Sequence, residues 1–371
     1  MASESFPDTT SGRLDLLRLF WSDLLPSDMV QEPQYMYFVH YVSSAIADSE
    51  NRLGLPSDKT KVAIKSVVNS RNKLRMHVGD IVRAHFSFDN PAAEDATRHV
   101  LQMIVRLWTM LDIQIEMPRY QAPGLLVWLE DESITAVTER FFSQKAQTDQ
   151  LFDLSGTVDP DLTAARLVLD HNIRIIWTSN LAEHLSMNWT RKRRMLKIFE
   201  HKIWAHRHLT APGQSPIPAD VLDELMGTYN LLFPMFNRAT ESLLEKDGMI
   251  ESFYSLGTCG KVPSRNWSDY KYWRKALHQL SEVLDEPPRG MQQFWRTSKK
   301  DPNLLNVVLF WISGVMVAIL TIVSSVCGVL SVQYAIESRD IGRSQLELAV
   351  SQACADSDLA EKLPQYCHQS K

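Results

Sequence analysis

The sequence contains few of the residue patterns that mark a known chemistry. Its four cysteines, Cys259, Cys327, Cys354 and Cys367, form no CxxC pair, so neither a zinc module nor a redox dithiol is indicated. The Walker loop, GxGxxG, GxSxG and HExxH patterns are absent as well. These absences exclude only protein classes that carry a linear signature, because many active sites have none.

An excess of charge of one sign is also missing. The chain has 39 basic and 44 acidic residues, a formal net charge of −5, and this balance does not indicate a nucleic-acid partner. Only 14 glycines and 17 prolines occur in 371 residues, which excludes fibrous and low-complexity classes. The 44% hydrophobic and 22% charged residues are typical of a globular protein that can bury a core.

The N-terminal region lacks the features of a secretory signal peptide. No basic residue precedes Arg13, and the N-terminal region has no uninterrupted apolar segment of the kind found in signal peptides. The first hydrophobic stretch, Leu14–Leu25, contains Asp15, Arg18 and Asp23, as the amphipathic helix of a soluble domain does. We therefore expect entry into a membrane to depend on a later segment.

That later segment is a long apolar run near the C-terminus. No charged side chain occurs between Asp301 and Glu337, and Val307–Val332 is almost wholly apolar. About 20 apolar residues suffice to cross the ~30 Å hydrocarbon core of a bilayer as a helix. We therefore predict a transmembrane helix over residues 304–334, followed by a short C-terminal tail over residues 335–371.

Flanking charges predict how this helix is oriented. More basic side chains precede it than follow it: Arg289, Arg296, Lys299 and Lys300 before, Arg339 and Arg343 after. Because lysine and arginine are retained preferentially in the cytosol, we expect a single-pass membrane protein with a cytosolic N-terminal domain. The tail would then lie in an oxidising compartment, where Cys354 and Cys367 can close a disulfide. The opposite orientation stays open, since it would expose glycosylation triplets at Asn188 and Asn266, and no organelle is indicated.

The predicted membrane helix carries a stripe of small residues. These recur at spacings of four, three, four and three: Gly314, Ala318, Thr321, Ser325 and Gly328. Small side chains let two helix backbones approach closely in lipid, where packing rather than apolar burial drives association. The stripe predicts a helix-pairing face, for a homo-oligomer or for another partner. The alternative is that such residues are simply common in membrane spans.

Residues 1–300 are predicted to form a mainly helical soluble domain, with an internal boundary near residues 146–160. Leu162–Glu183 and Arg193–Leu209 are among its predicted helices, because apolar residues recur there at helical spacing. Strand signals are sparse, and the best of them is the apolar run Leu125–Leu129. The predicted fold class is therefore all-α, with one C-terminal transmembrane helix.

Histidines provide the nearest approach to a chemical site. His201 and His208 would share one face of a helix, beside Glu200. A metal site needs several converging ligands, and Lys202 would oppose a cation, so we predict surface or boundary histidines here. The sequence predicts no catalytic residue, no metal site and no cofactor.

A basic cluster is the second feature of interest. It comprises Arg191, Lys192, Arg193, Arg194 and Lys197. On a domain held at a membrane, such a cluster can bind anionic headgroups, with about 1 kcal/mol per basic residue near the surface. The plainer interpretation is a solvated helix start, and both interpretations stay open.

Several segments together resemble a known group of proteins. They are Arg106–Leu111, Arg174–Leu185, Leu231–Pro234, Tyr272–Leu277 and Asp285–Pro288, followed by Trp295 and by Phe310-Trp311 in the membrane segment. The most specific is Ile-Trp-Thr-x-Asn-Leu-Ala-x-His-Leu, which ends at Leu185. The set resembles an uncharacterised family of filamentous-fungal proteins, over about residues 95 to 336. The resemblance implies a helical N-terminal domain, one C-terminal transmembrane helix and a fungal source, and it transfers no catalytic residue.

Two functions follow as hypotheses. The first is a membrane-tethered interaction or scaffold protein, whose partners are the lipid bilayer and a paired membrane helix. The alternative is an accessory protein or enzyme of a fungal biosynthetic pathway that acts at a membrane. A deep apolar pocket with a polar group such as His171, His184 or His201 would favour the small-molecule role. A filled core with an exposed apolar patch would favour the partner-binding role.

The membrane helix generates the first testable prediction. The full-length protein should sediment with membranes at high speed in the absence of detergent and become soluble when detergent is added, because water cannot solvate the apolar run. Recovery of the full-length chain as a monodisperse particle in the detergent-free supernatant would contradict the prediction. Protease protection of each end in sealed vesicles would establish the orientation.

Overall fold

The computed structural model describes residues 9–25, 32–86, 92–115, 126–150, 156–189, 193–259, 264–286, 302–355 and 364–367. The chain divides into two compact units, Met1–Gln292 and Gln293–Lys371. The internal boundary predicted near residues 146–160 lies inside the first unit.

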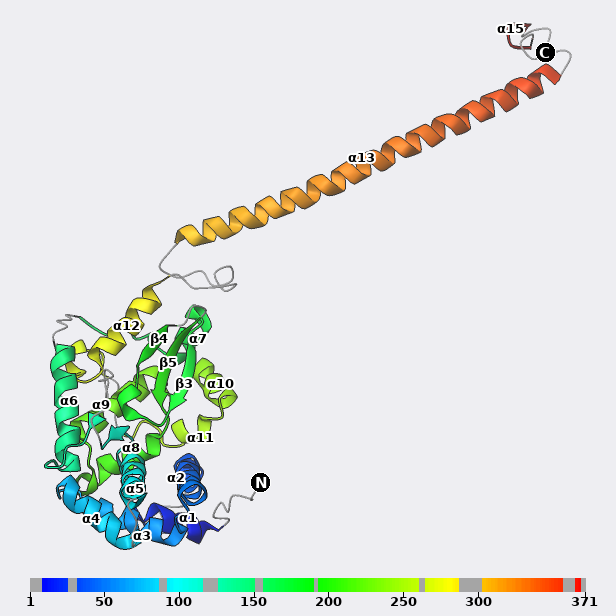
Figure 1. Ribbon diagram of the computed structural model, residues 1–371. Coiled ribbons are helices and arrows are strands. Elements are labelled where there is room, and N and C mark those ends of the chain that lie inside the picture. The colour runs from blue at the N-terminus through cyan, green and yellow to red at the C-terminus, as the bar shows by residue number, and fades with distance from the viewer. Residues whose placement is uncertain are drawn as a thin grey trace. The chain divides into compact units, whose positions relative to one another are not determined.

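The first unit is built mainly of helices, as predicted. They are α1 (Thr10–Leu17), α2 (Glu32–Leu53), α3 (Ser57–Val68), α4 (Arg75–Phe86), α5 (Ala92–Thr109), α6 (Ile134–Gln150), α7 (Ala164–His171), α8 (Lys202–Thr210), α9 (Ala219–Leu232), α10 (Arg238–Lys246), α11 (Ile250–Phe253) and α12 (Arg274–Asp285). Helices α1 to α5 gather at one end of this unit (Figure 1). Helix α2 packs against α1, α3, α5, α8 and α11 and so connects much of the helical core.

Two small sheets correct the all-α prediction. Strands β1 (Ile113–Gln114) and β2 (Leu126–Val127) pair in parallel, and β2 lies within the predicted strand Leu125–Leu129. The second sheet has the order β3-β5-β4, with β5 parallel to β3 and antiparallel to β4. Its strands are β3 (Arg174–Thr178), β4 (Met187–Trp189) and β5 (Arg194–Phe199).

The helix predicted over Leu162–Glu183 is wrong in its second half. Helix α7 ends at His171 because Asn172 adopts a left-handed conformation, with φ of 55°, which favours asparagine and stops a helix. The following Arg174–Thr178 contains isoleucine, tryptophan and threonine, residue types that favour strands. Apolar spacing alone did not separate these two short elements, since each is brief and rich in apolar residues.

The helix predicted over Arg193–Leu209 is wrong in its first half, which forms a strand. Arg194–Phe199 forms β5, in which Leu196 and Ile198 are buried on one face. Helix α8 begins only at Lys202. The register of β5 depends on pairing with β3 and β4 at once, and such long-range pairing leaves no local signal in the sequence.

The second unit contains one long helix, α13 (Pro302–Ala355), and the short α15 (Pro364–Cys367). At 1.5 Å per residue, the 54 residues of α13 extend for about 80 Å. The helix therefore passes beyond the predicted span of 304–334 and includes the first part of the predicted tail. No proline occurs between Pro302 and Pro364, so no residue of the kind that breaks helices interrupts it.

A buried carboxylate joins two helices of the first unit. Glu224 on α9 is 8% exposed and accepts hydrogen bonds from the backbone N–H groups of Lys271, Tyr272 and Trp273, at 2.6 to 3.0 Å. These groups lie directly before α12, where a helix leaves its first N–H groups without partners within the helix. Glu224 therefore holds the start of α12 against α9.

This arrangement predicts a loss of stability on substitution. Glu224→Ala leaves three N–H groups without an acceptor, two of them buried, and should lower the free energy of unfolding by about 3 kcal/mol. Glu224→Gln keeps one acceptor oxygen and should lower it by less. Denaturant unfolding of the detergent-solubilised protein, followed by tryptophan fluorescence, measures both changes, and equal stability of Glu224→Ala and the wild-type chain would contradict the prediction.

Candidate functional site

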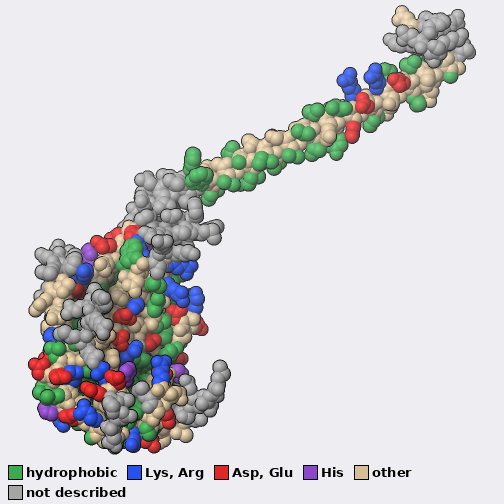
Figure 2. Space-filling model, viewed as in Figure 1, with side chains coloured by type: hydrophobic (Ala, Val, Ile, Leu, Met, Phe, Trp, Pro, Cys, Tyr) green, Lys and Arg blue, Asp and Glu red, His purple; other side chains and the backbone are tan. Residues whose placement is uncertain are grey.

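Helix α13 exposes apolar side chains along most of its length. Between Leu309 and Ala355 it is long and apolar enough to cross a membrane, and its most apolar part has no residue buried within the structure. Figure 2 shows hydrophobic side chains along this helix, with charged ones gathered toward its C-terminal part. Phe310 and Val329, for example, are 75% and 64% exposed. A surface of this composition needs an apolar environment around it.

The predicted pairing residues all lie on this helix and are exposed. Gly314, Ala318, Thr321, Ser325 and Gly328 belong to α13, and a Cβ added at either glycine would meet no atom within 4 Å. The hydroxyl groups of Thr321 and Ser325 donate to carbonyl oxygens of the preceding turn, Val317 and Ala318 for the first and Thr321 for the second. The hydroxyl hydrogens of Thr321 and Ser325 are thus bonded within the helix.

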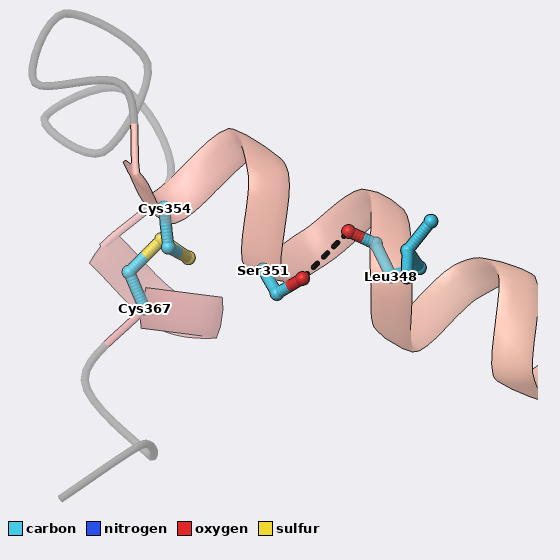
Figure 3. The surroundings of a disulfide bond; sticks show 4 residues. All are labelled: Leu348, Ser351, Cys354 and Cys367. Carbon is cyan, nitrogen blue, oxygen red and sulfur yellow. Dashed lines mark hydrogen bonds between the residues drawn. A yellow bond between two sulfur atoms is a disulfide. The ribbon is translucent and has the colours of Figure 1, made fainter.

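The two tail cysteines are joined in the structure. Cys354, in the last turn of α13, forms a disulfide with Cys367 of α15, across a separation of 13 residues (Figure 3). In the preceding turn Ser351 donates a hydrogen bond to the carbonyl oxygen of Leu348, at 2.7 Å. The disulfide therefore links the short helix α15 to the last turn of the long helix α13.

The basic cluster is divided by the fold. Arg191 and Lys192 lie outside the described residues, and Arg193 is exposed just before β5. Arg194 is buried, 5% exposed, and donates to both carboxylate oxygens of Glu286 at 2.7 and 2.9 Å. Its guanidinium group also lies 4.3 Å from the centre of the Trp189 ring. Arg194 is a structural residue, which corrects its prediction as part of a solvated helix start or an exposed lipid-binding surface.

Lys197 is likewise already paired. Its ammonium group lies 2.5 Å from Glu183 Oε1, and the same carboxylate accepts a hydrogen bond from the Thr178 hydroxyl. Because Glu183 offsets its charge, Lys197 contributes little to any net positive surface. Lipid binding by the cluster stays a prediction, which now depends on Arg191, Lys192 and Arg193.

His201, directly before α8, and His208, on α8, are buried, which corrects their prediction as surface or boundary side chains. His201 and His208 are 2% and 0% exposed. His208 packs between the rings of Trp21 and Trp204, at centroid distances of 5.5 and 4.6 Å. Burial lowers the pKa of both histidines to about 3, so both imidazoles are neutral at physiological pH.

His201 stands apart because a cavity reaches it. The cavity has a volume of about 500 Å³ and is lined by Met36, Tyr37, His40, Tyr41, Ser44, Glu200 and His201. The first five residues lie on α2, and the last two lie between β5 and α8. A larger depression of about 650 Å³ adjoins it, since Tyr41 and Ser44 line both.

Neighbouring aromatic rings fix the position of His201. Tyr41, Phe199 and Phe38 lie around its ring at centroid distances of 4.9, 5.7 and 5.9 Å. Nε2 of His201 lies 3.4 Å from Oε1 of Glu200, but neither ring nitrogen has a hydrogen-bond partner among the described residues. Both ring nitrogens of His208 also lack one, so this property does not distinguish His201 from its buried neighbour.

Two other buried polar groups of this region, His184 and Lys202, have structural partners. His184 bonds the Thr228 hydroxyl at 2.9 Å and accepts from the backbone N–H of Phe199. Lys202 donates to the carbonyl oxygens of Phe253 and Gly257 at 2.9 and 2.8 Å, and burial lowers its pKa to about 8. Among the described residues, no group of three or more His, Cys, Asp or Glu side chains is arranged to hold a metal ion.

Comparison of the chain with protein-family models, with curated proteins and with solved structures found no match. The resemblance to filamentous-fungal proteins therefore stays a prediction. The cavity at His201 was not predicted from the sequence, because the residues of α2 and those of α8 lie more than 150 positions apart. The only local signal was the neighbouring pair Glu200 and His201.

The buried histidines predict a specific dependence of stability on pH. Their folded pKa of about 3 lies below the usual value of 6.5, so the unfolded chain binds their protons more readily. Stability should therefore fall as the pH drops from 6.5 toward 3. His208→Phe should reduce the slope of the unfolding free energy against pH by about 1.4 kcal/mol per pH unit. The reason is that the variant lacks one group that takes up a proton on unfolding.

Urea unfolding of the detergent-solubilised protein at about pH 7 and about pH 5 checks this linkage. The measurement compares the pH-induced change in the wild-type chain with that in His208→Phe. Equal changes in the two proteins would show that His208 is protonated as readily in the folded state as in the unfolded state.

Proposed function

We propose that the protein is a single-pass membrane-anchored interaction or scaffold protein, which holds its helical domain at a bilayer and self-associates through α13. The observation that carries this proposal is the exposure of α13, whose apolar side chains from Leu309 onward are not covered by any of the residues that the structure describes. The expected arrangement places the N-terminal domain in the cytosol. Lipid covers most of the helix, and a second copy covers the face with small residues.

A seven-residue repeat supports pairing with a second copy. Small residues recur at intervals of seven through the apolar part of α13 and beyond it: Gly314, Thr321, Gly328, Ala335, Gly342 and Ala349. A strict seven-residue repeat is the pattern of helices that wind around each other with a left-handed supercoil. Two copies in one bilayer share depth and direction, so their repeats would lie level with each other.

The part of α13 beyond the apolar run continues the same face. Large apolar residues directly precede three of the small ones, in the pairs Tyr334-Ala335, Ile341-Gly342 and Leu348-Ala349. Tyr334, Ile341 and Leu348 are 69%, 59% and 62% exposed. Because large and small side chains alternate along the face, two identical helices can pack with the large residues of each against the small residues of the other.

Glycine replacement tests the proposal. In the full-length protein reconstituted in vesicles, Gly314→Leu combined with Gly328→Leu should weaken self-association by about tenfold, equivalent to roughly 1.4 kcal/mol. The physical reason is that leucine holds the two backbones apart. Energy transfer between two fluorescently labelled populations, followed as lipid dilutes them, measures the change.

A matched control lies on the other side of the same helix. At 100° per residue, Val323 and Val326 point away from the glycines, so Val323→Leu combined with Val326→Leu should leave association unchanged. Gly342→Leu tests the contribution of the part beyond the apolar run. Unchanged energy transfer in the Gly314 and Gly328 variant would remove the pairing face and leave only the anchor.

The alternative role, in small-molecule chemistry at a membrane, also has a specific observation in its favour. The cavity beside His201 combines apolar walls with a buried polar group, which is the arrangement expected of a small-molecule site. This feature does not depend on α13, so an anchored scaffold and a ligand-binding domain are compatible in one chain.

A further inference from the structure

A basic depression of about 550 Å³ lies where the segment after α1 meets the end of α3 and the turn between α3 and α4. Four of the side chains that line it are positively charged: Arg18, Lys65, Arg71 and Lys73. None of its lining residues is acidic. The chain as a whole has a formal net charge of −5, so the basic depression reverses the overall charge locally.

Three of these four side chains have no acidic partner. In the described part of the chain, Lys65, Arg71 and Lys73 form no ion pair with a carboxylate. Other basic residues of α3 and α4 are paired there: Lys61 with Asp58, Arg75 with Glu130 and Arg83 with Asp80. Like charges that surround one depression repel one another, so an anion between them would be stabilised.

Arg18 and Ser70 add groups from well-ordered surroundings. Nε of Arg18 donates to the carbonyl oxygen of Leu24 at 3.1 Å, which positions the guanidinium group. Its Nη1 atom is 3.9 Å from Oδ1 of Asp15, beyond hydrogen-bond distance. Ser70 lines the depression, is 7% exposed, and its hydroxyl group forms no hydrogen bond within the described residues. Both side chains can therefore donate to a ligand oxygen.

The charges indicate the class of ligand. A carboxylate has one negative charge, whereas a phosphate monoester has about two near pH 7 and three strong acceptor oxygens. Arginine forks match phosphate oxygens geometrically, and lysine adds a point charge. The end of α3 contributes about half a negative charge at most, which is small beside four basic side chains. The balance favours an anion with several charges.

We propose that the basic depression binds a multiply charged phosphate group, with Arg18 and Arg71 pairing with its oxygens and Lys65 and Lys73 adding charge from exposed positions. The phosphate can belong to a soluble compound or to a lipid headgroup, since both present the same chemistry. No residue of α13 lines the depression, so this binding is independent of self-association through the membrane helix.

Protection of lysines from acetylation tests the proposal. The full-length protein in detergent micelles reacts with sulfo-N-hydroxysuccinimide acetate, with or without sodium pyrophosphate at constant ionic strength, and mass spectrometry measures each lysine. Pyrophosphate should slow the reaction of Lys65 and Lys73 at least about threefold once most of the protein is bound. Lys59 is exposed on the same helix α3 but does not line the depression, so its reaction should be unchanged.

Two arginine variants separate contact with the ligand from the overall charge. Arg71→Gln removes one charge from the depression and should weaken binding of pyrophosphate about tenfold. Arg83→Gln removes one charge from α4 outside the depression, where Arg83 pairs with Asp80 at 2.9 Å. It should bind pyrophosphate like the wild-type protein. If Arg71→Gln does not fold, Lys73→Glu at an exposed turn position should abolish the protection of Lys65.

Vesicles distinguish the two sources of phosphate. The same reaction is run on the full-length protein in phosphatidylcholine vesicles with or without phosphatidic acid. Protection of Lys65 and Lys73 by phosphatidic acid alone would assign a lipid headgroup, and protection only by added pyrophosphate would assign a soluble compound.

Three results would overturn the proposal. The first is that neither pyrophosphate nor phosphatidic acid protects Lys65 and Lys73 more than Lys59. The second is full protection in the folded Arg71→Gln and Lys73→Glu proteins. The third is that sodium sulfate, with fewer charges than pyrophosphate, protects equally well at the same concentration and ionic strength, which would refute a site for multiply charged phosphate.

Discussion

The apolar surface that α13 exposes is the main physical constraint on this protein. Burying a valine, leucine or isoleucine side chain contributes about 1.5–3 kcal/mol, and many such side chains of α13 are exposed in the described part of the chain. Lipid can supply that cover, and a helix can satisfy its own backbone hydrogen bonds there. In the described part of the first unit, by contrast, most apolar side chains are buried in one continuous core.

Some buried polar groups of the first unit form hydrogen bonds between distant segments of the chain, and others do not. Glu224, Arg194, Lys202 and His184 each have partners on a distant segment, and each joins elements that the chain does not connect directly. Low dielectric surroundings make such contacts strong and make their loss costly. Among the described residues, His201 and His208 lack such partners at both ring nitrogens and are held by the aromatic rings around them instead.

The sequence by itself determined the long apolar C-terminal helix, the mainly helical class and the pair of cysteines available for a disulfide. These depend on composition and spacing along a continuous stretch, and an apolar run such as Val307–Val332 is long enough to be recognised without any distant contact. The tertiary structure decided the strands β3, β4 and β5, the burial of Arg194 and His208, and the cavity at His201. Each of these arises where segments far apart in the chain pack together, and a charged or polar side chain carries no local sign of whether a distant partner will enclose it.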